Sequence, residues 1–168
     1  SYFAEMEGVA RGAGVDIEDV TLLNARWEVM YSAYADAATE AGEDAVTDGC
    51  TAFGAQPEVT TSGHTIIGQN WDWNPDIDIF VMDIRQDDAP NMVAMTEAGI
   101  VGGKVGVNEH GIGMLLNGLV AEGDGDQPFR KPYHVRFREA LNAERLHNAV
   151  HPLIEKDRAN SANVLLAH

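Results

Sequence analysis

One cysteine and the glycine before it are the residues best suited to chemistry in this chain. Cys50 is the only cysteine among 168 residues, so it has no partner within the chain for a disulfide. Cleavage of the Gly49–Cys50 peptide bond would give Cys50 a free α-amine, which can take the thiol proton near neutral pH. Gly49 has no side chain to obstruct the strained turn that this cleavage needs. Gly49 and Cys50 are therefore candidates for the processing site of a self-cleaving cysteine nucleophile; a buried structural cysteine and an ordinary turn at Asp48-Gly49 are the alternatives.

The segment before Cys50 has helical periodicity. Apolar residues recur at helical spacing from Phe3 to Ala10, and glycines at 12 and 14 end that pattern. Asp16 is placed to cap a second, long helix, whose apolar stripe runs from Ile17 to Tyr34. Residues 35–48 lose the stripe and are expected to form an exposed connector, where a chain is readily cut. Residues 1–49 are thus predicted to be a helical leader.

From Cys50 onward the pattern changes to that of strands. Residues 50–56 and 64–71 flank a turn at 60–63 and predict a hairpin. A helix is expected from Tyr133 towards residue 150. Further strands are expected over residues 77–85, 91–96, 104–107, 111–119 and 161–167. Helices followed by many strands predict an α+β fold, with residues 50–168 as the part that carries the chemistry.

Five motifs occur in a specific order along the chain. They are Asp48-Gly-Cys-Thr51, Gly68-Gln-Asn-Trp-Asp-Trp73, Thr96-Glu-Ala-Gly99, Lys104-Val-Gly-Val-Asn108 and Gly111-Ile-Gly-Met-Leu-Leu-Asn117. Together they resemble the acyl-coenzyme A:6-aminopenicillanic acid acyltransferase family of the N-terminal nucleophile hydrolases. The resemblance covers essentially the whole chain. It implies a partial αββα sandwich with an N-terminal helical leader, truncated at its C-terminus.

The resemblance also implies companions for the nucleophile. Asp72 matches a family aspartate that orients the new ammonium group, and Asn117 matches an asparagine of the substrate pocket that can donate to an oxyanion. On a strand, Asn70 would face the same side as Asp72. Trp71 fits a pocket wall, and Thr51 is placed to hydrogen-bond near the nucleophile. An ordinary turn carboxylate at 72, a structural asparagine at 117 and a plain strand threonine at 51 are the alternatives.

Two nearby positions carry further expectations. Gln69 stands where the related choloylglycine hydrolases have arginine, which favours the penicillin acyltransferase branch. Asn24 and Arg26 are placed to brace the strand that begins at Cys50 from the helical leader, with an ordinary arginine on the helix surface as the alternative.

The function implied by the resemblance is that of an autoprocessing cysteine hydrolase or acyltransferase. Its Cys50 thiol would take the acyl group of a small amide or acyl-coenzyme A as a thioester, and the two pieces of the cleaved chain would stay together as a heterodimer. One alternative is an uncleaved thiol enzyme that pairs Cys50 with His64 or His110. Another is an inactive fragment or binding module.

Charge and composition exclude several partners. The formal net charge of −16 repels nucleic acid and anionic membranes. The six histidines are dispersed and one cysteine adds no second soft ligand, so no metal site is predicted, and no cofactor motif is present. No segment approaches the length of a transmembrane helix, and Ser1 does not begin a signal peptide, which leaves a cytoplasmic location as the default.

The acidic residues are spread along the chain, and only three lysines are present. This pattern favours adaptation to high salt, because screening relieves the self-repulsion of an acidic surface. We expect the midpoint of thermal unfolding to rise when the sodium chloride concentration is raised from low to molar. An unchanged or lower midpoint would contradict this prediction.

Overall fold

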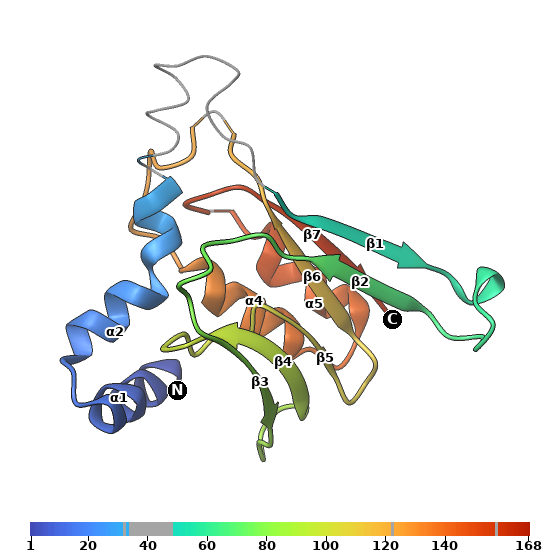
Figure 1. Ribbon diagram of the computed structural model, residues 1–168, viewed down its shortest axis with the longest axis horizontal. Coiled ribbons are helices and arrows are strands. Elements are labelled where there is room, and N and C mark those ends of the chain that lie inside the picture. Colours follow the sequence, from blue (N-terminus) through green and yellow to red (C-terminus); the bar gives the residue numbers. More distant parts are fainter. Residues whose placement is uncertain (32, 34–48, 122, 157) are drawn as a thin grey trace.

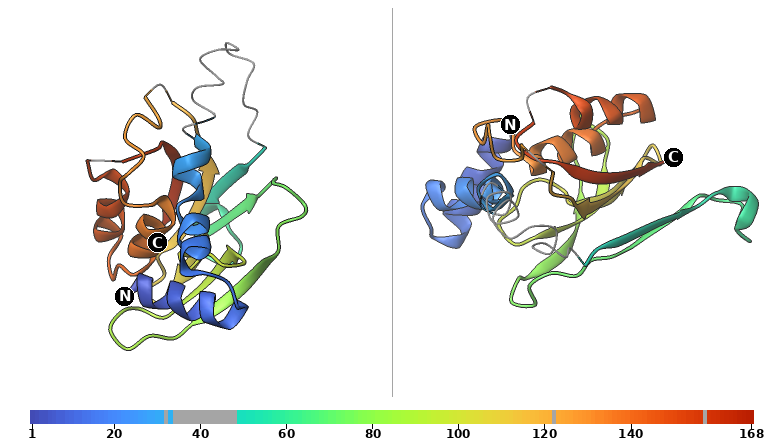
Figure 2. Two further views of the ribbon diagram at one scale, coloured as in Figure 1. Left: turned by 90° about the vertical axis from the view of Figure 1, so that its left-hand side faces the viewer. Right: turned by 90° about the horizontal axis from the view of Figure 1, so that it is seen from above.

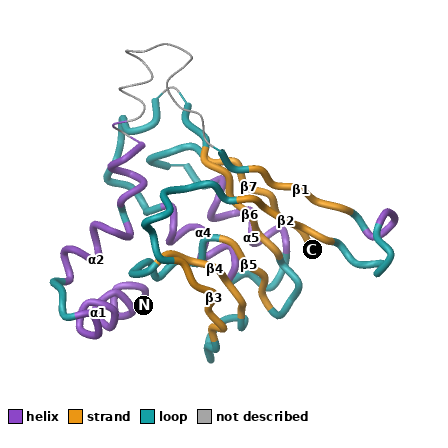
Figure 3. Tube along the Cα trace, in the orientation of Figure 1, coloured by secondary structure: helices purple, strands orange, loops and turns teal. Residues whose placement is uncertain are grey.

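The computed structural model describes residues 1–31, 33, 49–121, 123–156 and 158–168, and this part of the chain has an α+β fold (Figures 1 and 3). The helices are α1 (Tyr2–Ala13), α2 (Ile17–Asn24), α4 (Tyr133–Leu141) and α5 (Leu146–Ile154), with a short 3-10 helix at Pro57–Val59. The strands are β1 (Thr51–Ala55), β2 (Ile66–Asn70), β3 (Ile79–Ile84), β4 (Met92–Glu97), β5 (Val105–Asn108), β6 (Gly113–Gly118) and β7 (Ala162–Ala167).

All strands that the sequence predicts are present, and they form two antiparallel sheets. Strands β1 and β2 make a two-stranded hairpin in which Thr51 pairs with Asn70 and Ala55 pairs with Ile66. The other five strands form one sheet in the order β3-β4-β5-β6-β7. Burial alternates along β4, where Met92 and Ala94 are buried while Val93 is exposed. This alternation follows from the pleat, in which successive side chains of a strand point to opposite faces of the sheet.

The elements after residue 49 form three layers (Figure 2). Helices α4 and α5 cover one face of the five-stranded sheet, and the β1–β2 hairpin lies against its other face. Phe137 and Leu141 of α4 pack on Met114 and Leu116 of β6 in the main core. The expected αββα sandwich would have a further helical layer, and it stays a prediction, as does the division of the chain at residues 49 and 50.

The helical leader differs from the prediction at its second helix. Ser1 caps α1, and Asp16 stands at the N-cap of α2 as predicted. Helix α2 ends at Asn24, however, and the chain is helical again only from residue 26. The buried Asn24 side chain donates to the Val20 and Gly99 carbonyl oxygens, 2.8 and 2.9 Å away. This side chain ties the end of α2 to the loop after β4, so the prediction of one long helix was wrong. The 35–48 connector and Tyr34 lie outside the described residues.

The single helix predicted from Tyr133 towards residue 150 was also wrong, because two helices occupy this segment. The Asn108 side chain donates to the Leu141 and Ala143 carbonyl oxygens, at 2.9 and 2.7 Å. These carbonyls at the end of α4 thus bond to the last residue of β5. The chain turns there and starts α5 at Leu146. A side chain remote in sequence therefore sets the end of α4.

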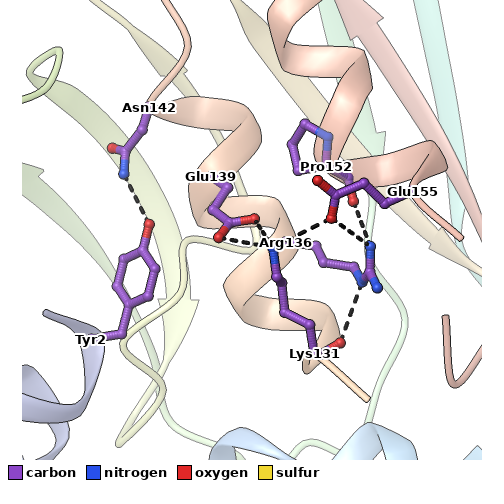
Figure 4. Close-up of polar contacts among 7 residues, drawn as sticks. All are labelled: Tyr2, Lys131, Arg136, Glu139, Asn142, Pro152 and Glu155. Carbon is purple, nitrogen blue, oxygen red and sulfur yellow. Dashed lines mark hydrogen bonds and ion pairs between the residues drawn. The ribbon is translucent and has the colours of Figure 1, made fainter. Parts of the chain in front are cut away.

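Polar contacts join α4 to its neighbours (Figure 4). Lys131, just before α4, forms an ion pair with Glu139, 2.9 Å away, and Arg136 donates to the Pro152 carbonyl of α5, 2.8 Å away. At the other end of the helix Asn142 donates to the Tyr2 hydroxyl of α1, at 3.1 Å. These contacts hold α4 between the leader and α5. No helix among the described residues is long and apolar enough to cross a membrane.

Candidate functional site

Cys50 lies directly before β1, at the end of the hairpin where Thr51 pairs with Asn70. Its side chain is partly buried and lines a small cavity. The other residues of this cavity are mostly aromatic or apolar, with one lysine. They come from the leader, the segment after β2, the loop before β5, strand β6 and helix α4: Trp27, Tyr31, Trp71, Trp73, Lys104, Leu116, Gly118 and Tyr133. The free space is only ≈ 10 Å³, about the room of one water molecule. We call this the Cys50 cavity.

Gly49 lies against Asp72. A Cβ atom built on Gly49 would stand 2.8 Å from the Asp72 Cβ atom and 3.2 Å from its Oδ2 atom. The first distance is too short for two carbon atoms that are not bonded to each other. The backbone at residue 49 therefore approaches Asp72 as closely as only a glycine allows. The structure thus brings together three of the predicted site residues: Gly49, Cys50 and Asp72.

The residues predicted to bind substrate fall into two groups. Trp71 lines the Cys50 cavity as expected for a wall residue. Thr51 and Asn70 are exposed and face each other across the end of the hairpin. Strand β2 ends at Asn70, so Asp72 lies beyond the strand, and the expectation that strand alternation sets Asn70 and Asp72 on one side does not apply.

Asn117 lies in β6 between two residues of the Cys50 cavity, Leu116 and Gly118, but its own side chain is not part of the cavity lining. Its Oδ1 atom accepts a hydrogen bond from Gln69 Nε2, 3.1 Å away. The same Gln69 amide contacts the Leu116 carbonyl oxygen and accepts from the Leu116 N–H at 3.3 Å. Gln69 therefore links the hairpin to β6 and fixes the Asn117 side chain, a role that its sequence position did not indicate.

A buried cluster of charged residues adjoins the cavity. Lys104 and Arg26 both form ion pairs with the Glu97 carboxylate, and the side chains of Lys104 and Glu97 are 2% and 1% exposed. The Lys104 ammonium lies 4.2 Å from the centre of the Trp71 ring and 5.0 Å from that of Trp27. Burial lowers the pKa of Lys104, while the Glu97 carboxylate acts in the opposite direction. We call Arg26, Glu97 and Lys104 the charge cluster.

The loop that joins β4 to β5 positions the charge cluster, because Glu97 precedes it and Lys104 ends it. The Thr96 hydroxyl donates to the Gly102 carbonyl at 2.9 Å, and Asn24 accepts from the Val101 N–H at 3.0 Å. A Cβ on Gly102 would stand 2.2 Å from the His134 carbonyl oxygen, so only glycine allows the loop to reach α4.

Asn24 and Arg26 therefore contact this loop and Glu97 before it, and not the strand that follows Cys50 as predicted. Glu97 and Lys104 were not predicted as site residues. One signal was available: Lys104 is the single charged residue between Ile100 and Val107, and a lone charge in such a run indicates a buried, paired side chain.

The two histidines of the alternative thiol mechanism are poorly placed. His64 precedes β2 at the end of the hairpin opposite to Cys50, which is about 13 Å along a five-residue strand. His110 lies in the β5–β6 turn, whereas the Cys50 cavity is reached at Leu116 and Gly118. Pairing of Cys50 with either histidine therefore has no support in this geometry.

Another histidine, His134 of α4, lies near Lys104 and Arg26 of the charge cluster. It is fully buried, and its two ring nitrogens have no hydrogen-bond partner among the described residues. Burial, followed by the charges of Lys104 and Arg26, lowers its pKa well below the ordinary value. In the described part of the chain, no three His, Cys, Asp or Glu residues are grouped so that they could hold a metal ion.

Comparison with known proteins finds similarity to an acyltransferase. The chain is similar to the 40 kDa form of acyl-coenzyme A:6-aminopenicillanic-acid-acyltransferase of Emericella nidulans, at 31% identity over 144 residues. The match covers 84% of this chain and 36% of that relative, so the chain spans about a third of the relative's length. No protein-family model matches the chain. The chain is therefore a distant relative of an acyltransferase.

Proposed function

We propose that the protein is an autoprocessing cysteine acyltransferase or amidohydrolase in which Cys50 is the nucleophile. The main support is the position of Cys50: it stands at the head of a strand and directly follows Gly49, whose backbone lies so close to Asp72 that a side chain at residue 49 would clash. The similarity to an acyltransferase supports the same class of reaction.

Autoprocessing would begin with attack of the Cys50 sulfur on the Gly49 carbonyl carbon. The Gly49–Cys50 C–N bond breaks, the nitrogen takes up a proton, and Gly49 is held as a thioester on Cys50. Water then hydrolyses this thioester, which leaves a carboxylate on Gly49 and a free thiol and α-amine on Cys50. The Asp72 carboxylate, close to Gly49, would orient the new ammonium group.

Acyl transfer would use the same sulfur. The α-amine of Cys50 takes the thiol proton, and the thiolate attacks the carbonyl carbon of the substrate. The tetrahedral intermediate collapses to a thioester, and the α-ammonium returns the proton to the leaving amine or coenzyme A thiolate. An acceptor amine or water then takes the acyl group.

The neighbouring side chains would serve substrate binding. The Gln69 hydrogen bond occupies the Oδ1 atom of Asn117, which leaves the Asn117 NH₂ group to donate to an oxyanion. Trp71 would form a wall, and the exposed Thr51 and Asn70 would contact substrate at the hairpin end. We infer a small amide or an acyl-coenzyme A as substrate, with the two cleavage products held together as a heterodimer.

The proposed function is tested on the complete gene product. Intact mass and N-terminal sequencing should find two fragments, the second of which starts at Cys50. The cleaved protein should then be screened with N-acyl amino acids, short peptides, β-lactams and acyl-coenzyme A thioesters. An uncleaved protein without turnover on any of these would sink the proposal, whereas turnover by an uncleaved chain would favour a thiol enzyme without autoprocessing.

Gly49→Val should slow autoprocessing by at least about tenfold, because the new side chain meets Asp72 and displaces the bond that Cys50 attacks. The matched control is Gly54→Ala on the same hairpin. Its added Cβ would lie 3.7 Å from Leu165 and 3.8 Å from Ile67, which are ordinary contacts. The rate is measured by mass spectrometry during expression. Equal rates for the two variants would show that residue 49 has no special steric role.

A further inference from the structure

The charge cluster next to the Cys50 cavity has one positive charge more than its carboxylate balances. Arg26 and Lys104 share Glu97, and their side chains are 15% and 2% exposed. An excess charge that is withdrawn from water is costly unless an anion lies nearby. The cluster therefore favours a negative charge at an adjoining position.

Among the residues that the structure describes, the other titratable groups near Lys104 and the cavity do not supply this charge. His134 is held neutral, since burial and the two cations lower its pKa. Tyr133 lines the cavity, but burial raises its pKa above the ordinary value, and Tyr31 is also a phenol. Asp72 is exposed and adjoins Gly49, and it is not among the residues of the cavity.

Cys50 fits the position of the missing anion. Its side chain lines the same small cavity as Lys104, and a charge on Cys50 acts to raise the pKa of Lys104. By reciprocity, the ammonium of Lys104 favours the ionised form of Cys50. Lys104 thus pairs with the Glu97 carboxylate and also lines the cavity that contains Cys50.

The aromatic residues keep Lys104 in this place. Its ammonium lies within 6.0 Å of the ring centres of Trp27, Trp71 and Trp73, a range in which cation–π attraction acts. The free space of ≈ 10 Å³ is about the room of one water molecule, and Cys50 is the group of the proposed reaction that shares this cavity with the ammonium.

We propose that Lys104 is a positioning residue that holds the sulfur of Cys50 as a thiolate. This inference rests on the proposed function, in which Cys50 is the nucleophile. Lys104 stays protonated throughout and takes no proton from Cys50; the thiol proton goes to the α-amine of Cys50 or to water. The buried ammonium supplies a fixed charge that stabilises the anion at the end of β1.

The test is the rate at which iodoacetamide alkylates Cys50 across the pH range, followed by mass spectrometry on the complete protein. Lys104→Met should slow alkylation at pH 7 at least about tenfold, which corresponds to a rise of one unit in the midpoint of the profile. Arg26→Met is the matched control, because it removes the other cation of Glu97 but is not a residue of the cavity. It should slow alkylation less than about threefold. A Lys104→Met profile equal to that of the wild type, or equal slowing by both variants, would overturn the proposal.

A second measurement uses the protein without a substitution at Lys104. It tests the proposal even if Lys104→Met does not fold. The thiolate absorbance at 240 nm of the wild type, with Cys50→Ala as blank, gives the ionisation midpoint of Cys50. The reference is a peptide of residues 47–54 if the chain is intact, or 50–54 if it is cleaved. We expect the protein's midpoint at least about one unit below that of the peptide; an equal or higher midpoint contradicts the proposal.

Neither measurement requires cleavage or turnover. A depressed, Lys104-dependent midpoint in a protein that is neither cleaved nor active would therefore refute the proposed function and leave the electrostatic role of Lys104 standing. An active, cleaved protein in which Lys104 does not affect the ionisation midpoint of Cys50 would support the proposed function and refute the role of Lys104.

Discussion

Replacing Cys50 by alanine is expected to abolish both autoprocessing and acyl transfer. Alanine leaves the fold at the head of β1 intact but removes the sulfur that attacks Gly49 and, after cleavage, the substrate. Loss of a covalent nucleophile lowers kcat by at least about 10³-fold. Mass spectrometry of the purified variant should find only the intact chain, and the acyl-transfer rate should fall to the background.

Cys50→Ser provides the control for this substitution. The serine hydroxyl can perform the same attack but ionises far less readily, so slow cleavage and low residual activity are expected. Circular dichroism spectra of both variants should match that of the wild type, which would show that both variants fold. Cleavage at residue 49 in Cys50→Ala, or activity above about a tenth of wild type, would show that Cys50 is not the nucleophile.

The second large effect concerns stability. Glu97→Gln keeps the size of the side chain but removes the carboxylate that Arg26 and Lys104 share. Two largely buried cations would then face each other without a common anion, which costs about 3–5 kcal/mol of unfolding free energy. For a chain of this length, the expected fall in Tm is roughly 6–20 °C. Urea unfolding followed by circular dichroism measures the change.

Glu139→Gln is the matched control, because it removes a carboxylate from an ion pair at the surface. The Glu139 and Lys131 side chains are 31% and 36% exposed, so the loss should stay below about 1 kcal/mol. Equal destabilisation by the two variants would contradict the view that the charge cluster is a buried, interdependent group.

The strands could be predicted from the sequence because their signals are local. Alternating apolar residues and turn residues such as Gly63 and Gly111, which both adopt positive φ, mark the hairpins without reference to the rest of the chain. The position of Cys50 at the start of a strand follows from the same change of period.

The breaks in the helices could not be predicted because remote side chains make them. Asn24 ends α2 by bonding to Gly99 and Val101, and Asn108 ends α4 by bonding to Leu141 and Ala143. Helical periodicity continues through both breaks, so a pattern of apolar residues indicates one helix where the tertiary contacts produce two.

The candidate site was predictable only in part. Gly49, Cys50 and Asp72 occur in motifs, and the structure brings them close together. Glu97 and Lys104 also occur in motifs, but their meeting with Arg26 depends on the path of the β4–β5 loop. The bond from Gln69 to Asn117 joins two layers of the fold, and sequence spacing carries no information about it.

The central claim is that Cys50, freed by cleavage, carries the acyl group. The most direct test is the intact mass of the complete protein after brief reaction with an acyl-coenzyme A thioester and acid quenching. We expect one acyl group on the fragment that begins at Cys50, and neutral hydroxylamine should remove it, as it removes a thioester. An acyl group found on an intact chain, on another residue, or in a form that resists hydroxylamine would contradict it.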